Sequence, residues 1–567
     1  MKSRITKSLV IIAVFCLAGT LPAGTALGAG PPFEVWALDQ SGTAGTLYVY
    51  DGLALGASPT RATPEVIDLA GTVAALCSSQ TGAAPTRAHM LLFNRSQTHA
   101  ILSYVATGHV VFMDAATRSP VACIDVGDQA HAAFPAPDES YVVVANQNGK
   151  LLQRITTDYA TNSFTIDNAA TLNVATCSTP NGWRCQDDGS TQVGVRPNNV
   201  VICPVVDSSS RWVFVTLGGG GLFVVDGKAT PMGIVAEYDR DAIHANGCGG
   251  VEKGGKMFIT SGGGPGNATE ADVYAFDLRR FPASGFNAPN TPLPRWVFSK
   301  DAGEHDTHGA LLTKAQDGAY AWFGDRFANA VEVVDTRTSN LVNTFSLRGP
   351  AWPDPAPDLM GIAPGGDWAF AALRGPCPLT ANDPAAGNAV GSTPGIGVIA
   401  VERGGFSGRL VGVASISSPT AQPFDCPSVA GEDSTTDRAD PHGIAVRSIL
   451  PQLRVSLSST REGDKVSYSA TIANTAENVM AVNAYLAIPV PPGVSVVRAT
   501  ASPRGTGFRG LEGGAAAWIV ETIPAGGSVG PFTYTGQASG DGPEPVAAFL
   551  HWLYPQEGSL VSNAAAP

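Results

Sequence analysis

Charge is scarce in this sequence, and positive charge is the scarcer kind. Only 15% of its 567 residues are charged, and 35 basic residues against 48 acidic ones give a net charge of -13. Nucleic-acid binding needs clusters of Lys and Arg that neutralise phosphates, and the sequence contains no such cluster. A basic amphipathic stretch suited to an anionic membrane surface is also missing. The composition therefore argues against nucleic acid or a membrane as the partner.

Several catalytic signatures are missing as well. The chain has no His-Glu-x-x-His zinc helix, no phosphate-binding Walker A loop and no Cys-x-x-Cys-His haem attachment site. No convincing amphipathic helix is present, whereas 65 glycines and 42 prolines suit a chain rich in turns. These features point to an all-β protein and leave open whether it is an enzyme.

What the chain has instead is a repeated short apolar strand that usually ends in an acidic residue. Clear copies lie at residues 47–51, 110–114, 222–226, 273–277 and 331–335, with looser copies at 150–155 and 397–402. Each copy sits among further short strands separated by polar turns. A period of roughly 40 to 50 residues with about four strands is typical of β-propeller blades. Seven copies therefore predict a seven-bladed propeller over residues 31–448.

The two ends of this region suggest how the ring closes. The N-terminal end supplies only three strands, at residues 33–40, 47–51 and 65–69, while an orphan strand at residues 440–446 follows the last full blade. Pairing them completes one blade and removes two exposed sheet edges. We expect strand 440–446 to close the propeller.

A family resemblance supports this architecture. Pro441 to Val446, Asp317-Gly318 and Val331 to Thr338 are similar to the opening strand, turn and third strand of YVTN-type bacterial β-propeller proteins. The resemblance covers about residues 33–448. It implies the fold and leaves the function open, because such propellers serve many purposes.

Residues 449–567 have a different rhythm and contain no cysteine. Their strand spacing predicts a β-sandwich of roughly 100 residues. The stretch from Ile472-Ala-Asn-Thr-Ala to Pro491-Pro-Gly-Val resembles the Ig-like repeat modules of bacterial surface proteins, which implies a spacer or adhesion role.

The N-terminus predicts export. Lys2, Arg4 and Lys7 precede a short apolar run at residues 9–17, and small residues near position 28 offer a cleavage point, so residues 1–30 are interpreted as a signal peptide. Eight cysteines remain, an even number that fits an oxidising compartment. We expect a periplasmic or secreted protein without a membrane span. Eight cysteines allow 105 pairings, and the sequence alone does not select one of them. Among them we expect neighbours to pair: Cys77–Cys123, Cys177–Cys185, Cys203–Cys248 and Cys377–Cys426.

The candidate site comes from five histidines that share one position in the repeat. They stand at the start of the first strand of five repeat units, which lies innermost in a propeller: His89, His131, His244, His308 and His442. Asn199 or a neighbour and Met360 take that position in the other two. Neutral imidazoles are common ligands of transition metals, and the thioether of Met360 would favour copper. Asp306, Asp358 and Asp440 stand two residues before the shared position and would orient the imidazoles.

Three functions remain open. The first is an exported propeller that binds an unknown protein or small-molecule ligand, with a histidine-lined channel that holds a transition metal. The second is a periplasmic copper-dependent oxidoreductase with the axial histidines as ligands. The third, a sugar- or lactone-acting enzyme with an axial calcium, would require a mainly oxygen-lined centre. A purely structural role, in which backbone groups or water satisfy each histidine, is the competing interpretation of the whole cluster.

Overall fold

The computed structural model describes residues 32–187, 195–245, 247–262, 271–281, 292–300, 304–314, 318–383, 386–418, 437–476, 479–500, 506–539, 545–554 and 558–565. The chain divides into two compact units, of which one is Phe33–Ser448 and the other contains Ile449–Pro567. The predicted signal peptide at residues 1–30, Asp317 of the predicted turn and Cys426 lie outside the described residues.

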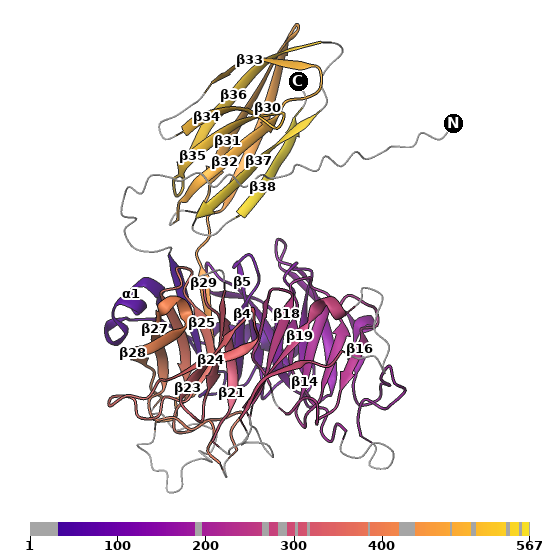
Figure 1. Cartoon of the computed structure of the whole chain (residues 1–567), viewed down its shortest axis with the longest axis vertical. Coiled ribbons are helices and arrows are strands. Elements are labelled where there is room, and N and C mark those ends of the chain that lie inside the picture. The colour runs from indigo at the N-terminus through magenta and orange to yellow at the C-terminus, as the bar shows by residue number, and fades with distance from the viewer. Residues whose placement is uncertain are drawn as a thin grey trace. The chain divides into compact units, whose positions relative to one another are not determined.

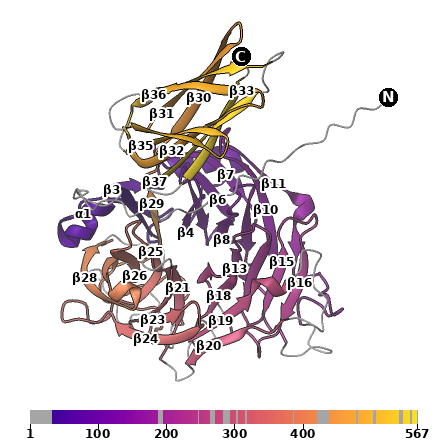
Figure 2. The same ribbon diagram turned by 45° about the horizontal axis from the view of Figure 1, so that its top comes forward.

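The first unit is a β-propeller of seven sheets in the part of the chain that is described, each with a path of four antiparallel strands (Figures 1 and 2). From the inner to the outer strand, the first three sheets are β29(Pro441–Ser448)-β1(Phe33–Asp39)-β2(Thr46–Asp51)-β3(Glu65–Asp68), β4(Ala88–Phe93)-β5(His99–Tyr104)-β6(His109–Asp114)-β7(Ser119–Asp125) and β8(Ala130–Pro135)-β9(Tyr141–Asn146)-β10(Leu151–Asp158)-β11(Ser163–Ile166), where β12(Leu172–Asn173) also pairs with β10. The next two are β13(Val201–Val206)-β14(Trp212–Leu217)-β15(Leu222–Asp226)-β16(Gly233–Tyr238) and β17(Gly250–Lys253)-β18(Lys256–Ser261)-β19(Ala271–Asp277)-β20(Arg295–Lys300). The last two are β21(Thr307–Leu312)-β22(Tyr320–Asp325)-β23(Ala330–Asp335)-β24(Asn340–Ser346) and β25(Pro357–Ile362)-β26(Trp368–Leu373)-β27(Gly395–Glu402)-β28(Ser407–Ser415).

Burial explains why the inner strands read as continuous apolar runs. Every residue of β5, β9 and β14 is buried, because each blade packs against a neighbour on both faces. The outer strand β24 alternates between exposed and partly buried residues, since one of its faces meets solvent. Helices are short among the described residues: α1 (Gly52–Ala57) and α2 (Thr72–Thr81) both lie in the first blade region, and single 3-10 turns lie there and in later blades.

A bulge recurs at the start of the innermost strands. Between β21 and β22 the register shifts from Thr307–Asp325 to Ala310–Phe323, and β25 shifts likewise between Pro357 and Met360. Comparable shifts occur at the start of β4, β8, β13 and β29. A bulge inserts residues that do not pair with the neighbouring strand and turns their side chains. The inserted residues include His89, His131, His308, Asp358 and His442.

The propeller closes through its first and last strands. Trp36 of β1 pairs with Ala445 of β29, and the ladder continues from Phe33–Ser448 to Leu38–Gly443. At its inner end the backbone N–H of Asp440 donates to the Asp39 carboxylate at 2.8 Å. The blade thus contains strands from both ends of the unit.

The second unit contains two antiparallel sheets in its described residues. They are β30(Leu453–Glu462)-β31(Lys465–Asn474)-β36(Ser528–Ala538)-β33(Val494–Thr500) and β34(Thr506–Glu512)-β35(Ala515–Ile523)-β32(Ala481–Pro489)-β37(Val546–Tyr554)-β38(Gly558–Ala565). Trp518, Phe532 and Tyr534 are fully buried in one core that takes residues from both sheets. The all-β fold class predicted from the sequence, a propeller followed by a sandwich, is confirmed.

Three of the predicted disulfides are present: Cys77–Cys123, Cys177–Cys185 and Cys203–Cys248. The fourth predicted pair includes Cys426 and cannot be placed in the described residues. Bridges of this kind fit a protein that folds in an oxidising environment. Over the described residues, none of the helices has the length and apolarity required to cross a bilayer.

Candidate metal centre

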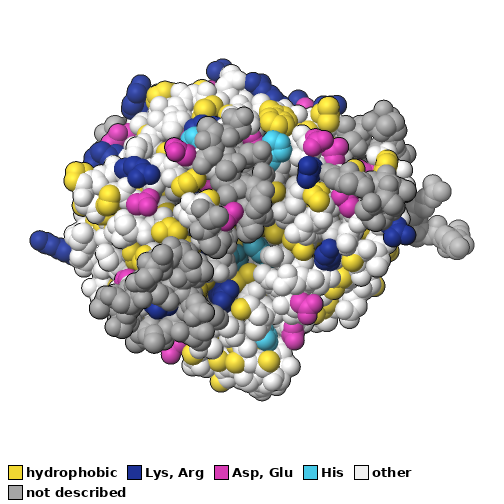
Figure 3. Space-filling view, turned by 90° about the horizontal axis from the view of Figure 1, so that it is seen from below, with side chains coloured by type: hydrophobic (Ala, Val, Ile, Leu, Met, Phe, Trp, Pro, Cys, Tyr) yellow, Lys and Arg dark blue, Asp and Glu magenta, His cyan; other side chains and the backbone are white. Residues whose placement is uncertain are grey.

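Four of the five predicted histidines meet at the inner ends of four different blades. His89, His131, His308 and His442 lie in β4, β8, β21 and β29, with 1%, 9%, 4% and 0% of their surface exposed. The His89 ring is 4.0 Å from the His442 ring and 4.7 Å from the His131 ring, centroid to centroid. His308 and His442 are 5.5 Å apart by the same measure. Figure 3 shows histidine side chains recessed in a hollow near the middle of one face of the molecule.

The four imidazoles are held in the same way, through the Nδ1 atom. The Nδ1 atom of His442 lies 3.0 Å from the backbone oxygen of His89, and that of His89 lies 3.3 Å from the side-chain oxygen of Gln40. His131 is bound through Nδ1 to the side-chain oxygen of Gln147, and His308 to a carboxylate oxygen of Asp358. Each acceptor favours the tautomer that carries its proton on Nδ1, which leaves the Nε2 lone pair for a ligand.

Two of these Nε2 atoms are buried and lack a hydrogen-bond partner among the described residues. They belong to His89 and His442. Buried polar atoms without a partner are rare in folded proteins, because desolvation without a replacement bond costs about 1 to 3 kcal/mol. Ligand atoms of His308, Asp358 and His442 also lie within 4.8 Å of one another. The arrangement can therefore coordinate a metal ion with imidazole nitrogens from separate blades.

Burial keeps three of the rings neutral at physiological pH. Desolvation is the main cause that lowers the pKa of His131 to about 4, and it holds the pKa values of His89 and His442 well below the usual range. Neighbouring imidazoles act in the same direction on His89, whereas the Asp358 carboxylate opposes the shift of His442. Neutral imidazole is the form that binds metals, so no proton has to be displaced.

A buried chain of alternating charges runs beside the rings. Arg326 pairs with Asp306 at 2.5 Å and with Asp358 at 3.2 Å, and Arg374 pairs with Asp358 and Asp440 at 2.6 Å each. All five side chains are fully buried. Burial alone would raise the pKa of Asp358, but His442, His308, Arg326 and Arg374 outweigh it and hold this pKa well below the usual value. Asp358 is therefore an ionised anchor for His308.

The sequence predicted the carboxylates and missed the two arginines. Arg326 directly follows β22, and Arg374 directly follows β26. The shared position of the two arginines, directly after the second strand of two successive blades, is a weak signal because each arginine is isolated in the sequence. A buried guanidinium needs carboxylate partners, and the Asp residues before the innermost strands provide them.

The prediction for Met360 is wrong. The bulge in β25 places Asp358 at the position in the blade that His308 occupies in β21. Met360 instead packs in the apolar core with Trp322 and Val331. The thioether argument for copper at this centre therefore fails. Asn199 donates to the backbone oxygens of Val174 and Cys185 and is held within its own blade region.

His244 has different surroundings from the other four histidines. Its Nδ1 atom is 2.6 Å from the carboxylate of Asp272 in β19, and its ring packs edge-on against Trp296 of β20. Its side chain is 24% exposed. Cys248, which lies two residues before β17, is joined to Cys203 by a disulfide and lies near His131.

Comparisons with known proteins identify no family and no activity for this chain. No protein-family model matches the chain, and no curated protein sequence matches it. A solved structure of a protein from Lactobacillus plantarum is 11% identical with a TM-score of 0.45, over 73% of this chain and 99% of that one. A putative 6-phosphogluconolactonase from Bacteroides uniformis is 11% identical with a TM-score of 0.44, over 68% and 96%. The β-propeller domain of Cps50 (Swd1) from Myceliophteria thermophila is 12% identical with a TM-score of 0.31, over 50% and 93%.

Proposed function

We propose that this chain is an exported binding protein whose propeller holds a first-row transition-metal ion at its axis. His308 and His442 supply imidazole ligands beside the Asp358 carboxylate, since ligand atoms of these three residues lie within 4.8 Å of one another, and His89 offers a further Nε2 from a ring 4.0 Å from that of His442. The observation that carries the proposal is the shared arrangement of the rings: each Nδ1 is bound to an oxygen acceptor, and the buried Nε2 atoms of His89 and His442 have no partner among the described residues. Metal-binding histidines are oriented in this way by their outer-shell partners.

The donor set determines which ions we expect. Imidazole suits copper, zinc, nickel and iron, and divalent copper binds such sites most tightly in the first-row series. Asp358 already serves His308 and two arginines, so it contributes charge and orientation more than a free coordination position. We therefore propose copper(II) as the tightest ligand of the isolated protein and zinc(II) as the next to test.

Conservative asparagine variants test the centre. In His442→Asn the new amide N–H can still donate to the backbone oxygen of His89, so the variant removes Nε2 and keeps the bond made by Nδ1. Loss of an orienting partner alone costs 10 to 100-fold in affinity, so loss of a ligand should weaken copper(II) binding by about 100-fold or more. Calorimetric titration of the full-length, chelator-treated protein measures the affinity.

His551→Asn is the matched control, because His551 lies in β37 of the other compact unit. Its copper affinity should equal that of the wild type. A wild-type protein that retains no copper or zinc after gel filtration, or one whose affinity is unchanged in His89→Asn and His442→Asn, would leave the histidines with a structural role only.

Further parts of the proposal rest on sequence. The predicted signal peptide supports a location in the periplasm or outside the cell. The resemblance of residues 33–448 to YVTN-type propellers supports that type of blade, and the Ig-like resemblance supports a spacer or adhesion role for residues 449–567. Copper-dependent oxidoreductase activity remains the alternative function. Turnover of a redox substrate by the copper-loaded wild type, lost in His442→Asn, would favour that alternative.

A further inference from the structure

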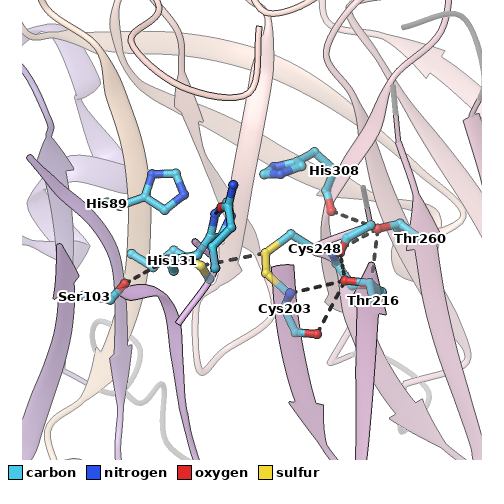
Figure 4. The surroundings of a disulfide bond; sticks show 12 residues. His89, Ser103, His131, Cys203, Thr216, Cys248, Thr260 and His308 are labelled. Carbon is cyan, nitrogen blue, oxygen red and sulfur yellow. Dashed lines mark hydrogen bonds between the residues drawn. A yellow bond between two sulfur atoms is a disulfide. The ribbon is translucent and has the colours of Figure 1, made fainter. Parts of the chain in front are cut away.

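A disulfide lies directly beside the axial histidines. It joins Cys203 of β13 to Cys248, which precedes β17 in the next blade, with Cα atoms 5.1 Å apart. Figure 4 shows it in one group with His89, His131 and His308. Cys203 is fully buried and Cys248 is 4% exposed. The bridge is therefore buried near the propeller axis. A disulfide that only linked two surface loops would lie elsewhere.

The groups around this disulfide form a set of soft donors. A ring nitrogen of His131 and the two sulfur atoms all lie within 4.8 Å of one another. The sulfur of Met90 is 3.8 Å from that of Cys248. Ligands of a tetrahedral metal with bonds of about 2.3 Å are separated by about 3.8 Å, so small movements would bring these atoms into coordination range. Thiolate and thioether sulfur select copper(I) over harder ions.

Hydrogen bonds hold the two cysteines near each other independently of the bridge. The Thr216 hydroxyl accepts from the backbone N–H of Cys203 at 3.2 Å and donates to the oxygen of Gly247 at 2.5 Å. The Thr260 hydroxyl accepts from the N–H of Gly249 at 2.9 Å. These bonds fix the backbone on both sides of Cys248. Reduction should therefore leave the thiols close together.

Gly247 allows the backbone before Cys248 to pack directly against the backbone of Thr260. A Cβ atom at this position would lie 1.5 Å from the backbone oxygen of Thr260, so only glycine fits there. His131 is fixed through its bond to Gln147. The donors consequently come from elements whose positions are set by neighbours outside the disulfide, as a preorganised metal site requires.

We propose that Cys203 and Cys248, together with His131 and Met90, form a second, redox-controlled site that binds copper(I) when the disulfide is reduced. A dithiol reductant supplies two electrons and two protons: the S–S bond breaks, both cysteines become thiols, and the reductant becomes a cyclic disulfide. Binding of copper(I) then displaces the thiol protons to solvent. A disulfide oxidant such as oxidised glutathione reverses the step: it accepts two electrons from the two thiolates and two protons from solvent and leaves as two thiols, the Cys203–Cys248 bond forms again, and the copper(I) ion is released. This site is separate from the axial centre of the proposed function and does not depend on it.

The test uses the full-length protein with and without anaerobic reduction by dithiothreitol, which is then removed. Copper(I) is titrated in competition with a chromogenic chelator. We expect reduced protein to bind one more equivalent of copper(I) than oxidised protein, and copper(I) to protect two thiols from a thiol reagent. The double variant Cys203→Ser and Cys248→Ser should lose the extra equivalent, whereas Cys177→Ser and Cys185→Ser should retain it.

Met90→Leu provides a second variant that keeps the volume of the side chain and both thiols. It should weaken copper(I) binding by about 10-fold and leave zinc(II) binding to the reduced protein nearly unchanged, because the thioether favours the soft ion. Equal copper(I) binding by oxidised and reduced wild type would overturn the proposal. So would an extra equivalent that survives removal of both cysteines, or equal binding by Met90→Leu and the wild type.

The axial centre and this site can fail separately. His442→Asn should lose copper(II) binding in the oxidised protein and keep the extra copper(I) equivalent after reduction. If the oxidised wild type binds no metal but the reduced wild type gains the equivalent, the proposed function is wrong and the redox-controlled site stands. The converse result leaves only the axial centre.

Discussion

Replacing Arg374 by methionine is expected to lower the stability of the propeller by about 3 to 5 kcal/mol. The guanidinium binds Asp440 through two nitrogens and Asp358 through a third, and all three side chains are fully buried. Without it, two carboxylates remain in the interior with fewer partners, and the Coulombic repulsion between them is unscreened. The propeller transition in urea measures the loss.

Arg409→Met is the control for this variant. Arg409 forms an ion pair with Glu402 at 3.3 Å in which both side chains are largely exposed. Exposed pairs contribute less than about 1 kcal/mol, so the urea midpoint should hardly move. Equal midpoints for Arg374→Met and the wild type would show that the buried network does not stabilise the ring.

Acidification from pH 7 to pH 5 is expected to destabilise the metal-free propeller strongly. Burial lowers the pKa of His131 to about 4, below the unfolded value of 6.5. As the pH falls through 6.5 the unfolded chain therefore binds protons that the folded chain rejects, and His131 alone costs about 2 kcal/mol at pH 5. His89 and His442 shift in the same direction and add to the loss.

One buried group opposes this trend. Burial raises the pKa of Asp39 from 3.8 to about 6 despite the hydrogen bonds from Ser41 and Asp440, and the Asp440 charge adds to the rise. Because the folded state then holds its proton more tightly than the unfolded state, acidification across that range stabilises the fold by about 1 kcal/mol at pH 5. The destabilisation from the three histidines is larger than the stabilisation from Asp39, so the net effect of acidification is a loss of folding stability.

His131→Asn separates the contributions. It keeps a donor for Gln147 and removes the titrating ring, so the difference in urea midpoint between pH 7 and pH 5 should shrink relative to the wild type. His551→Asn in the other unit should leave that difference unchanged. A wild-type midpoint that is the same at both pH values would contradict the assignment of neutral buried rings.

The fold class could be predicted from sequence because its signals are local and repeated. Strands such as 331–335 recur with the same turns. The N-terminal blade lacks its innermost strand, and the unpaired strand near residue 442 supplies it. The positions of the axial side chains depend on something a linear pattern hides. Bulges shift the register by one or two residues, so Asp358 replaces Met360 at the ring, although both belong to one strand.

The electrostatic partners were harder still to predict. Arg326 and Arg374 make their contacts across blades, with residues up to 66 positions away, and no short motif marks them. Gln40 and Gln147, which orient two of the rings, also lack a sequence signature. Their roles follow from where the ring of blades brings separate inner strands together, which requires the three-dimensional arrangement.

The closing blade has a consequence for biosynthesis. Asp39 and Asp440, which hydrogen-bond across it, are 401 residues apart in the chain. The inner edge of β1 therefore stays unpaired until β29 has been synthesised, near the end of the propeller. Contacts between residues so far apart in the chain slow folding. An unpaired strand edge invites pairing with other chains. The yield of folded protein should therefore depend on how long that edge stays unpaired.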